Sequence, residues 1–573
     1  MWCKYCSTET NEEKCPICGR HTVEDIPIEV YWCETCKVPV IKQVTDARKT
    51  TCPCCKNAMR YMAKDVRPVF PEERLLVELM LGKEPNFYVK DSVWASTGSR
   101  YYINGKTKNI TKKMYASADV ERLARGVVEY KNINTYKYFD GYIEKFIDIN
   151  RDRLQFLIDE ATGFIRETAE KFKEENRIIS FSGGKDSTVT ADIVTKALSD
   201  PSLVHIFGNT TLEFPTTLDY AKRFRENHPH AIFQVAKNNE QIFMDMADEI
   251  GPPARMMRWC CSMFKTGPIT RVLNSLYRNQ QVLTFYGIRK SESVSRSKYN
   301  RVEDDSESIK INKQTVAAPI FFWLDVDIWL YILAEKIDFN DAYRLGYERV
   351  GCWLCPNNNS RDIFLSNIYM PERSKEWRNF LIKFAKKIGK PDPEEYIDSG
   401  AWKARQGGNG LPAAKDVKIR FTNCTSEEHA KIYKLSRPFS DELVGMFVPF
   451  GKLAPELGRK ILHETIILDV RTNVPIMSIQ PFKENDFDYA VKIRTMNVAD
   501  HNALQRKAGY QIRKYNACHK CLKCESVCKA GAISVVGGDY YINPERCVHC
   551  GMCVDQKILR GGCMMDKYLR TKD

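Results

Sequence analysis

The sequence IISFSGGKDS, residues 178–187, joins a β-branched run to a glycine turn, and a helical run at 188–198 follows directly. Two glycines let the backbone approach an anion, and a helix N-terminus offers free N–H groups and a positive dipole end. Ser182 and Ser187 add hydroxyl donors, and Lys185 adds charge. The spacing differs from the Walker A pattern. We therefore predict an anion-binding loop, with a simple helix cap as the alternative.

Strand-like and helical stretches alternate around this loop, from about 166 to 400, with candidate strands at 178–181, 203–207, 232–235 and 282–286. This alternation predicts an α/β fold in which helices cover a parallel sheet. Arg289 and Arg296 follow the strand at 282–286, at the edge where such sheets bind ligands. Arginines there could grip phosphate or sulfate bidentately. The alternative is surface pairing with Glu292 and neighbouring acids.

Together these motifs resemble the PP-loop of the ATP-pyrophosphatase superfamily and, more narrowly, the sulfonucleotide reductases, which reduce phosphoadenylyl- or adenylyl-sulfate. The resemblance covers about 170–370. Besides the glycine turn, it rests on NTTLEFP at 209–215, the CC…K..P segment at 260–268, GIRKSESVSR at 287–296, the PI..W…D.W.Y pattern at 319–331 and GCWLCP at 351–356. It implies a doubly wound parallel sheet of the adenine nucleotide alpha hydrolase-like kind. The nucleotide-binding residues that it implies are Ser182, Gly183, Gly184, Lys185, Asp186, Ser187, Asn209, Thr210, Arg289, Glu292 and Arg296. The catalytic residues that it implies are Lys185, Lys265, Arg289 and Arg296.

The 22 cysteines predict metal centres, because nineteen of them lie in Cx2C, Cx3C or CC sets. Outside these sets are Cys54, Cys424 and Cys563. One set in the nucleotide domain resembles the tandem-cysteine signature of adenylyl-sulfate reductases and fits a [4Fe-4S] cluster, with zinc as the alternative; its members are Cys260, Cys261, Cys352 and Cys355.

The C-terminal cysteines resemble a bacterial-type ferredoxin with two [4Fe-4S] clusters. In that fold the fourth cysteine of each motif crosses to the other cluster. One cluster would then be held by Cys518, Cys521, Cys524 and Cys563, and the other by Cys547, Cys550, Cys553 and Cys528. Two features depart from the family pattern: Lys529 replaces a proline, and nine residues rather than three separate Cys553 from Cys563.

Paired CxxC knuckles at the N-terminus predict two structural zinc ions, because so short and polar a stretch could not fold on apolar burial alone. The first site would use Cys3, Cys6, Cys15 and Cys18, and the second Cys33, Cys36, Cys52 and Cys55. A docked structural cap is expected, with nucleic-acid contact as the alternative.

We expect five regions: tandem zinc ribbons at 1–62, an α+β domain at 63–165, the PP-loop domain at 166–400, a domain of unknown role at 401–510 and a ferredoxin domain at 511–573. A helix is expected at 75–81, a hairpin followed by a basic loop at 101–113, a linker at 403–415 and a strand at 465–470.

The formal charge of +14 would suggest nucleic acid. Thiolate-bound metals would reduce it to about +4, so charge supports an RNA partner only weakly. No apolar run reaches the length of a membrane span, and MWCKYCSTET lacks the apolar stretch of a signal peptide. We expect a cytoplasmic protein without membrane contact.

Three functions are compatible with these motifs. Sulfonucleotide reductases carry a C-terminal ECGxH segment with a nucleophilic cysteine, and no such segment occurs here. The first hypothesis is a reductase that releases sulfite with electrons from its fused ferredoxin, itself reduced by a low-potential donor. The alternative is an ATP-dependent enzyme that adenylates and thiolates a substrate such as RNA. The third is a non-catalytic nucleotide or redox sensor.

Overall fold

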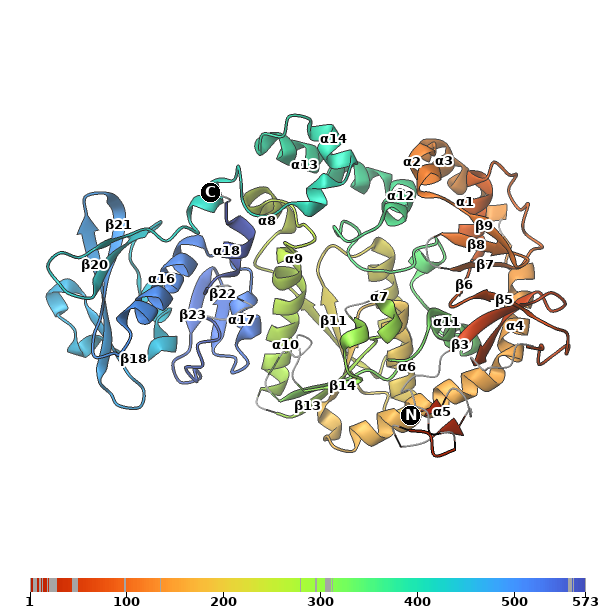
Figure 1. Cartoon of the computed structure of the whole chain (residues 1–573), viewed down its shortest axis with the longest axis horizontal. Helices are drawn as coiled ribbons and strands as arrows, with labels where there is room; N and C mark the ends of the chain where they lie inside the picture. Colours follow the sequence, from red (N-terminus) through yellow and green to blue (C-terminus); the bar gives the residue numbers. More distant parts are fainter. Residues whose placement is uncertain are drawn as a thin grey trace.

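The computed structural model describes all residues except 1, 4–7, 10–11, 13, 18, 20–27, 44–49, 97–98, 134, 279, 294–295, 305–310, 312, 555–558, 560 and 572–573. A parallel-sheet core occupies the middle of the molecule. N-terminal sheets and helices flank it on one side, and an antiparallel sheet with the C-terminal segment flanks it on the other (Figure 1).

The core sheet has the strand order β12-β11-β10-β13-β15-β14 and is parallel except for the edge strand β14, which confirms the predicted α/β class. Its strands in chain order are β10 (Arg177–Phe181), β11 (Val204–Asn209), β12 (Ile232–Lys237), β13 (Val282–Tyr286), β14 (Val302–Glu303) and β15 (Gln314–Ala317). The order reverses between β10 and β13, so the crevice beyond their carboxyl ends is the expected ligand position.

Helices cover the core sheet because its central strands are buried on both faces, as their apolar sequences require. They are α6 (Lys185–Leu198), α7 (Pro215–Asn227), α8 (Phe243–Ile250), α9 (Trp259–Cys261), α10 (Gly267–Tyr277) and α11 (Asp325–Ala334). Two helices lie mainly in the segment assigned to the preceding domain, α4 (Lys137–Ile149) and α5 (Arg151–Ala169). They pack into the same hydrophobic core as β10 and α11.

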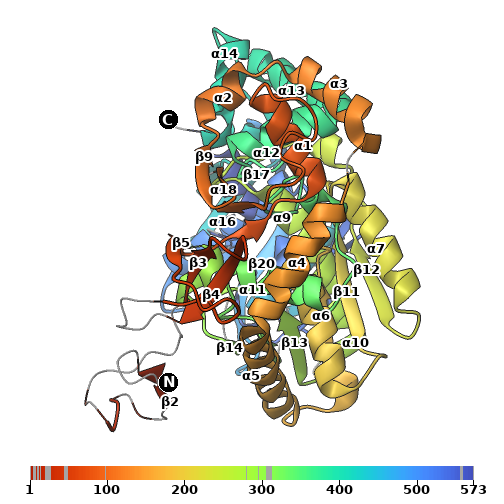
Figure 2. The same cartoon turned by 90° about the vertical axis from the view of Figure 1, so that its right-hand side faces the viewer.

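The described residues of the N-terminal region form three further antiparallel sheets, β4-β3-β5, β6-β7-β8-β9 and the two-stranded β1-β2. Figure 2 shows the first of these beside α4. The strands are β1 (Trp2–Cys3), β2 (Thr8–Glu9), β3 (Ile28–Cys33), β4 (Val38–Gln43), β5 (Arg60–Ala63), β6 (Arg67–Pro68), β7 (Val93–Ser96), β8 (Arg100–Ile103) and β9 (Lys106–Asn109). The helices are α1 (Pro71–Met80), α2 (Lys112–Ser117) and α3 (Val120–Tyr130). The expected hairpin is present as β8–β9. The basic loop was wrong beyond residue 111, because Thr111 caps α2.

Three helices follow the core, α12 (Ser360–Tyr369), α13 (Pro371–Lys387) and α14 (Pro393–Asp398). The stretch 403–415, predicted as a linker, is packed against its surroundings. The Arg405 guanidinium donates to the carbonyls of Ile250 and Pro252 at 3.0 and 2.9 Å, and Gly408 N donates to Arg570 O at 3.2 Å. The prediction of a linker is therefore wrong, because the polar groups of this stretch bond to other parts of the protein rather than to water.

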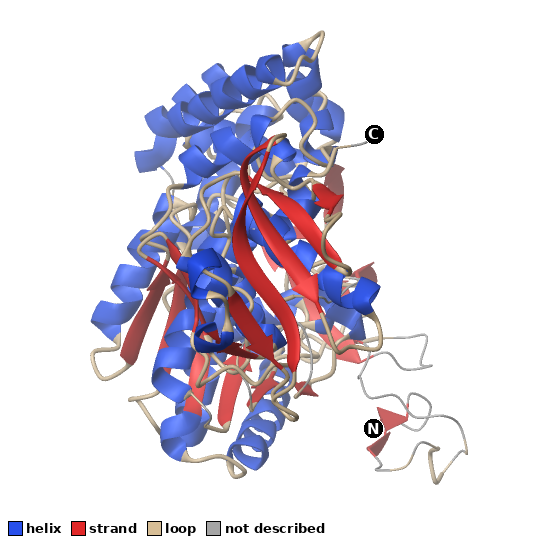
Figure 3. Ribbon diagram, turned by 90° about the vertical axis from the view of Figure 1, so that its left-hand side faces the viewer, coloured by secondary structure: helices blue, strands red, loops and turns tan. Residues whose placement is uncertain are grey.

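The C-terminal half is built on a six-stranded antiparallel sheet, which faces the viewer in Figure 3. Its order is β16 (Phe421–Asn423), β17 (Ala430–Leu435), β21 (Phe487–Thr495), β20 (Pro475–Glu484), β19 (Thr465–Leu468) and β18 (Lys452–Ala454). A short helix α15 (Asp441–Gly445) precedes β18, and α16 (His501–Ala517) leads from the sheet to the last cysteines. The final segment adds α17 (Lys523–Val527), β22 (Ile533–Val536), β23 (Asp539–Ile542) and α18 (Met564–Leu569), and it shares one hydrophobic core with the sheet and α16. Among the described helices, none combines the length and apolar character that crossing a bilayer requires.

Candidate functional site

The glycine turn after β10 is shaped by close packing. Gly183 has a φ of +71°, which favours glycine, and a Cβ there would lie 2.9 Å from Thr217 Cγ2. Gly184 occupies the N-cap of α6, and the next backbone N–H, that of Lys185, donates to the Tyr343 hydroxyl at 3.0 Å. The turn therefore presents the start of α6 at the carboxyl edge of the sheet, as the sequence predicts.

The two serines of the turn brace it from within. Ser187 Oγ donates to Gly184 O at 2.8 Å and lies 3.0 Å from Ser182 Oγ. The Ser182 N–H donates to the same Ser187 hydroxyl at 3.1 Å. These hydroxyls, predicted as ligand donors, hold the loop in shape in this structure.

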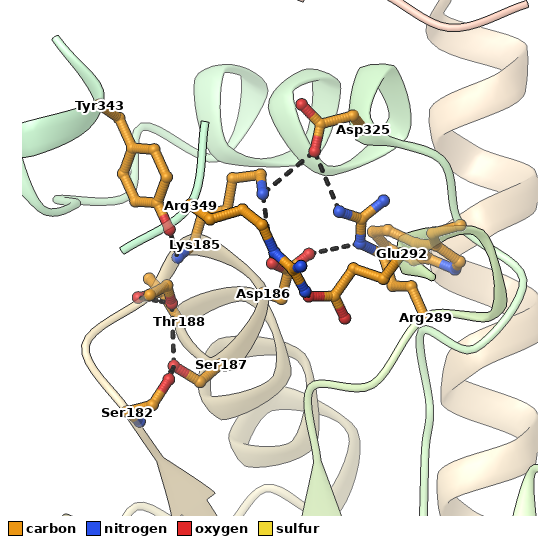
Figure 4. Close-up of polar contacts among 12 residues, drawn as sticks. Ser182, Lys185, Asp186, Ser187, Thr188, Arg289, Glu292, Asp325, Tyr343 and Arg349 are labelled. Carbon is orange, nitrogen blue, oxygen red and sulfur yellow. Dashed lines mark hydrogen bonds and ion pairs between the residues drawn. The ribbon is translucent and has the colours of Figure 1, made fainter. Parts of the chain in front are cut away.

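Two cations and two carboxylates interlock above the turn (Figure 4). Lys185 Nζ lies 3.2 Å from Asp186 Oδ2 and 3.0 Å from Asp325 Oδ1. Arg289 bonds the same two carboxylates, reaching Asp325 Oδ1 at 3.0 Å. Burial alone would raise the pKa of Asp186, but Arg289 and Lys185 hold it at about 2. The predicted cations thus converge, and acidic partners already balance their charge.

Asp65, which the sequence analysis did not select, joins this cluster from the N-terminal region. Its carboxylate oxygens accept the free backbone N–H groups of Asp325 and Val326, each at 2.9 Å, and so cap α11. Burial and the neighbouring Asp325 raise the pKa of Asp65 to about 7. Asp65 therefore helps to place the Asp325 carboxylate, which pairs with Lys185 and Arg289.

A cavity of about 140 Å³ opens beside these charges. It is lined by Asp65, Val66, Arg67, Ala95, Ser96, Lys185, Arg289, Ser291, Glu292, Asp325, Glu348 and Arg349. Glu292 pairs with both Arg296 and Arg349, so Arg296 takes the acidic partner that the alternative interpretation gave it. Lys185 and Arg289 are the predicted catalytic residues at this cavity; Arg296 and Lys265 are not among its lining residues.

A buried ionic network fixes the N-terminal wall of the cavity to the core. Glu73 receives Arg67 through two bonds of 2.6 and 2.7 Å, Arg361 at 2.6 Å and the Tyr101 hydroxyl at 2.8 Å. Arg361 also reaches Glu348, at 2.9 Å. Because Arg67, Arg361, Tyr101 and Glu73 itself are all buried, the two regions are joined rigidly at this point.

The predicted second nucleotide loop faces the core cysteines. The Thr210 hydroxyl donates to Glu213 at 2.6 Å and lies 3.5 Å from Cys352 Sγ. Asn209 accepts the N–H of Thr211 at 2.9 Å and thereby shapes the turn. Neither Asn209 nor Thr210 lines the cavity beside Lys185.

The four core cysteines lie around one partly buried place. Cys260 and Cys261 stand in α9, and the charges of Cys352 and Cys355 act on the pKa of Cys260. A hydrogen bond with Cys260, together with the charges of Lys265 and Arg258, lowers the pKa of Cys261. Four partly buried thiols that act on one another could hold a metal centre.

The C-terminal cysteines fall into two neighbourhoods. Burial, together with the charges of Cys524 and Cys518, raises the pKa of Cys563 to about 12. Burial and the charges of Cys528 and Cys550 raise the pKa of Cys547. The distant Cys563 therefore lies near the first motif, and Cys528 lies near Cys547 of the second.

The first C-terminal cysteine motif abuts the core. A Cβ on Gly267 of α10 would lie 2.4 Å from Leu522 Cβ, so only glycine admits this contact. Arg271 pairs with Glu525 at 2.9 Å across the same junction. Tyr568 of α18 is buried there, and besides burial the charges of Cys521, Cys260 and Cys261 raise its pKa. Tyr568 thus lies between the two cysteine sets.

Four N-terminal thiols converge as a metal site would require: the ligand atoms of Cys33, Cys36, Cys52 and Cys55 all lie within 4.8 Å of one another. Four thiols at this separation suit a tetrahedral zinc ion. The other predicted zinc set, Cys3, Cys6, Cys15 and Cys18, lies outside the described residues except for Cys15 and the backbone of Cys3.

Comparison with known proteins agrees with the site. Residues 176–358 match the family described as the phosphoadenosine phosphosulfate reductase domain. The adenosine 5'-phosphosulfate reductase of Staphylococcus haemolyticus is 26% identical over 255 residues, 43% of this chain and 92% of that enzyme. A solved phosphoadenylyl-sulfate reductase from Candida auris, in a phosphate complex, is 18% identical, with a TM-score of 0.28, and covers 37% of this chain and 96% of its own.

Two uncharacterized proteins of Methanocaldococcus jannaschii are similar over longer stretches. Each is 30% identical, over 313 and 266 residues, or 52% and 46% of this chain. The chain spans 62% and 61% of the length of these relatives. The middle of the chain is therefore similar to sulfonucleotide reductases, as the motifs indicated, and the regions on either side lie beyond that family match.

Proposed function

We propose that this chain is an iron–sulfur reductase that cleaves adenylyl-sulfate or its 3′-phosphorylated form to sulfite, with electrons supplied through its C-terminal module. One observation carries the proposal: Cys521 of the first C-terminal motif and Cys260 of the core pair pack against the same hydrophobic cluster, which includes Tyr568. A module that served only as a structural appendage would not need its ligand loop at this junction.

Three [4Fe-4S] clusters and two zinc ions are proposed, held by the cysteine sets assigned above. When bound, such clusters pass single electrons at low potential. A low-potential donor protein would supply them, in the cytoplasm. The donor chemistry fits at the sets that the structure describes, whose thiols act on one another and, apart from the exposed Cys550, are partly or fully buried.

The reaction balances without a protein nucleophile, which suits the absence of an ECGxH segment. Two electrons break the sulfur–oxygen bond. The bridging oxygen leaves with the nucleoside phosphate, and sulfur leaves as sulfite with the electron pair. Both electrons come from the external donor, so no other co-reactant is required.

The residues of the cavity would bind the substrate and offset its charge. Lys185 and Arg289 are placed to receive phosphate and sulfate oxygens once these displace Asp186 and Asp325. Lys265 is exposed beside the core cysteines, where its charge reaches Cys261, and would face the sulfate. Arg296 would exchange Glu292 for the nucleotide.

A second candidate is the ATP-dependent enzyme that adenylates a substrate such as RNA and then thiolates it. The carboxylates of Asp65, Asp186 and Asp325 favour it. Oxygen ligands beside a phosphate site are what a magnesium-bound triphosphate uses.

One experiment separates the two candidates. Anaerobically purified protein is reduced with a low-potential donor and then given adenylyl-sulfate, its 3′-phosphate or ATP. Cluster absorbance, sulfite and pyrophosphate are followed together. Reoxidation with stoichiometric sulfite, abolished in Cys524→Ala, supports the reductase. Clusters that stay reduced with both sulfonucleotides, in protein that splits ATP to AMP and pyrophosphate, refute it in favour of thiolation.

A further inference from the structure

Lys514 is a buried lysine between the two C-terminal cysteine neighbourhoods. It lies in α16, four residues before Cys518, and only 1% of its surface is exposed. The helix belongs to the antiparallel-sheet domain, for which the sequence suggested no role. Its last turn enters the core that this domain shares with the cysteine module.

The contacts of Lys514 reach both neighbourhoods. Its Nζ donates to the backbone carbonyl of Cys553, in the second motif, at 2.6 Å. It also lies 3.5 Å from the Tyr540 hydroxyl, which interacts with the thiol of Cys524 in the first motif. The charged groups that act most strongly on Lys514 are all cysteines: Cys524, Cys553, Cys563 and Cys518.

A buried ammonium group needs a counter-charge, because desolvating it alone is costly. In the part of the chain that the structure describes, the hydrogen bonds of Lys514 go to a carbonyl and a phenol. No ion pair to a carboxylate is found for it there. Metal binding would convert the nearby cysteine thiols to thiolates and so supply that negative charge. Lys514 is therefore complementary to metal-bound thiolates and not to a neighbouring acid.

We propose that Lys514 is a positioning residue whose fixed positive charge raises the reduction potentials of both C-terminal clusters. The inference rests on the proposed function, because it requires iron–sulfur clusters at these cysteines. A four-iron cluster with four thiolates is an anion that gains one more negative charge on reduction. A cation held nearby, away from water, stabilises the reduced form more than the oxidised form.

A charge shared between two centres also has a consequence for electron flow. Because Lys514 contacts elements of both motifs, its charge would raise the two potentials together and leave the difference between them nearly unchanged. An electron could then pass from the second motif, which includes the exposed Cys550, to the first motif beside the core. This would give α16 and the antiparallel-sheet domain a part in electron transfer.

The test compares Lys514→Gln, which removes the charge but keeps a donor, with Lys514→Arg, which keeps the charge. The control is Arg506→Gln, which removes an exposed charge from the same helix. All are made in full-length protein that also carries Cys352→Ala and Cys355→Ala, so that the remaining clusters are those of the C-terminal module. Iron is quantified, and reduced clusters are followed by electron paramagnetic resonance during an anaerobic redox titration.

We expect Lys514→Gln to lower the reduced-to-oxidised ratio of both clusters at fixed ambient potential at least about tenfold, a shift of about 59 mV. Lys514→Arg and Arg506→Gln should titrate like the parent. Unchanged potentials in Lys514→Gln would overturn the proposal, as would a parent without iron at these cysteines. If Lys514→Gln fails to hold iron, retention in Lys514→Arg still supports a charge requirement, whereas loss in both variants would show that only the shape of lysine matters. The redox titration uses no nucleotide. If the separate nucleotide assay yields no sulfite, the proposed reaction is refuted, but the measured effect of Lys514 on the cluster potentials still holds.

Discussion

Gly287, directly after β13, provides a steric test of how the anion loop is held. A Cβ at this position would lie 2.7 Å from the carbonyl carbon and oxygen of Asp186 and from the backbone nitrogen of Ser187. Ordinary contact begins near 3.4 Å, so Gly287→Ala must push the start of α6 away by about 0.7 Å. All three obstructing atoms are backbone, so no side-chain rotation relieves the clash.

Overpacking of this kind costs about 1–3 kcal/mol. Because the clash falls on the residues that place Lys185 and Asp186, we expect the cost to appear in ligand binding, as affinity about 5- to 150-fold weaker. Isothermal titration with adenylyl-sulfate, its 3′-phosphate and ATP measures it, and iron and zinc contents should be unchanged. Gly351→Ala is the matched control, since a Cβ there meets nothing within 4 Å. Wild-type affinity for every ligand that the parent binds, in a folded Gly287→Ala protein, would refute this account of the loop.

Three further predictions concern charge and metal. Lys185→Ala should weaken nucleotide binding by about 1.5–3 kcal/mol, the value of one charged contact, without unfolding the protein; unchanged titration curves would reduce the loop to a helix cap. Anaerobic protein should hold about twelve iron, about twelve sulfide and about two zinc ions per chain, and Cys352→Ala with Cys355→Ala should remove about four iron; loss of zinc instead would mean that the core site is misassigned. Glu73→Gln should cost about 3–5 kcal/mol in urea unfolding, because it leaves the buried Arg67 without its carboxylate and removes one of the two carboxylates that Arg361 contacts. Burial would raise the pKa of Glu73, but Arg67 and Arg361 hold it below its usual value. In the wild type this contribution to stability is therefore fully present above the unfolded pKa of about 4.3, and it is lost as the pH falls through the lowered pKa of the folded state. A stability difference between wild type and Glu73→Gln that does not change with pH would contradict this.

Several features of the fold could be read from local patterns. Four core strands, β10 to β13, were predicted to within two residues, because β-branched runs are a local signal. The helix after the glycine turn was expected from 188 and begins three residues earlier, at Lys185, and the short strands β14 and β15 were not predicted. The convergence of Cys33, Cys36, Cys52 and Cys55 also follows from their spacing. The two cysteines of each pair, with two residues between them, face one site when the two knuckles pack together.

Other features were decided by a partner, sometimes only a few residues away in the chain. The basic stretch near residue 112 forms a helix because Thr111 caps it, and the glycine-containing stretch at 403–415 is packed because Arg405 finds carbonyls far away in the chain. Arg296, expected at the nucleotide, is held by Glu292. In each case a partner decided the outcome, and the residue type alone left it open.

The sequence by itself indicated the kind of chemistry: a predicted anion loop in an α/β domain similar to sulfonucleotide reductases, and cysteines at spacings typical of metal sites. These depend on residues close in the chain, whose spacing already restricts their geometry. Only the tertiary structure decided which charges meet. Asp65 caps the helix that bears Asp325, Tyr568 lies between two cysteine sets, and Lys514 reaches both C-terminal motifs. Such contacts join residues far apart in sequence, and burial in the folded protein is what makes their charges act strongly on one another.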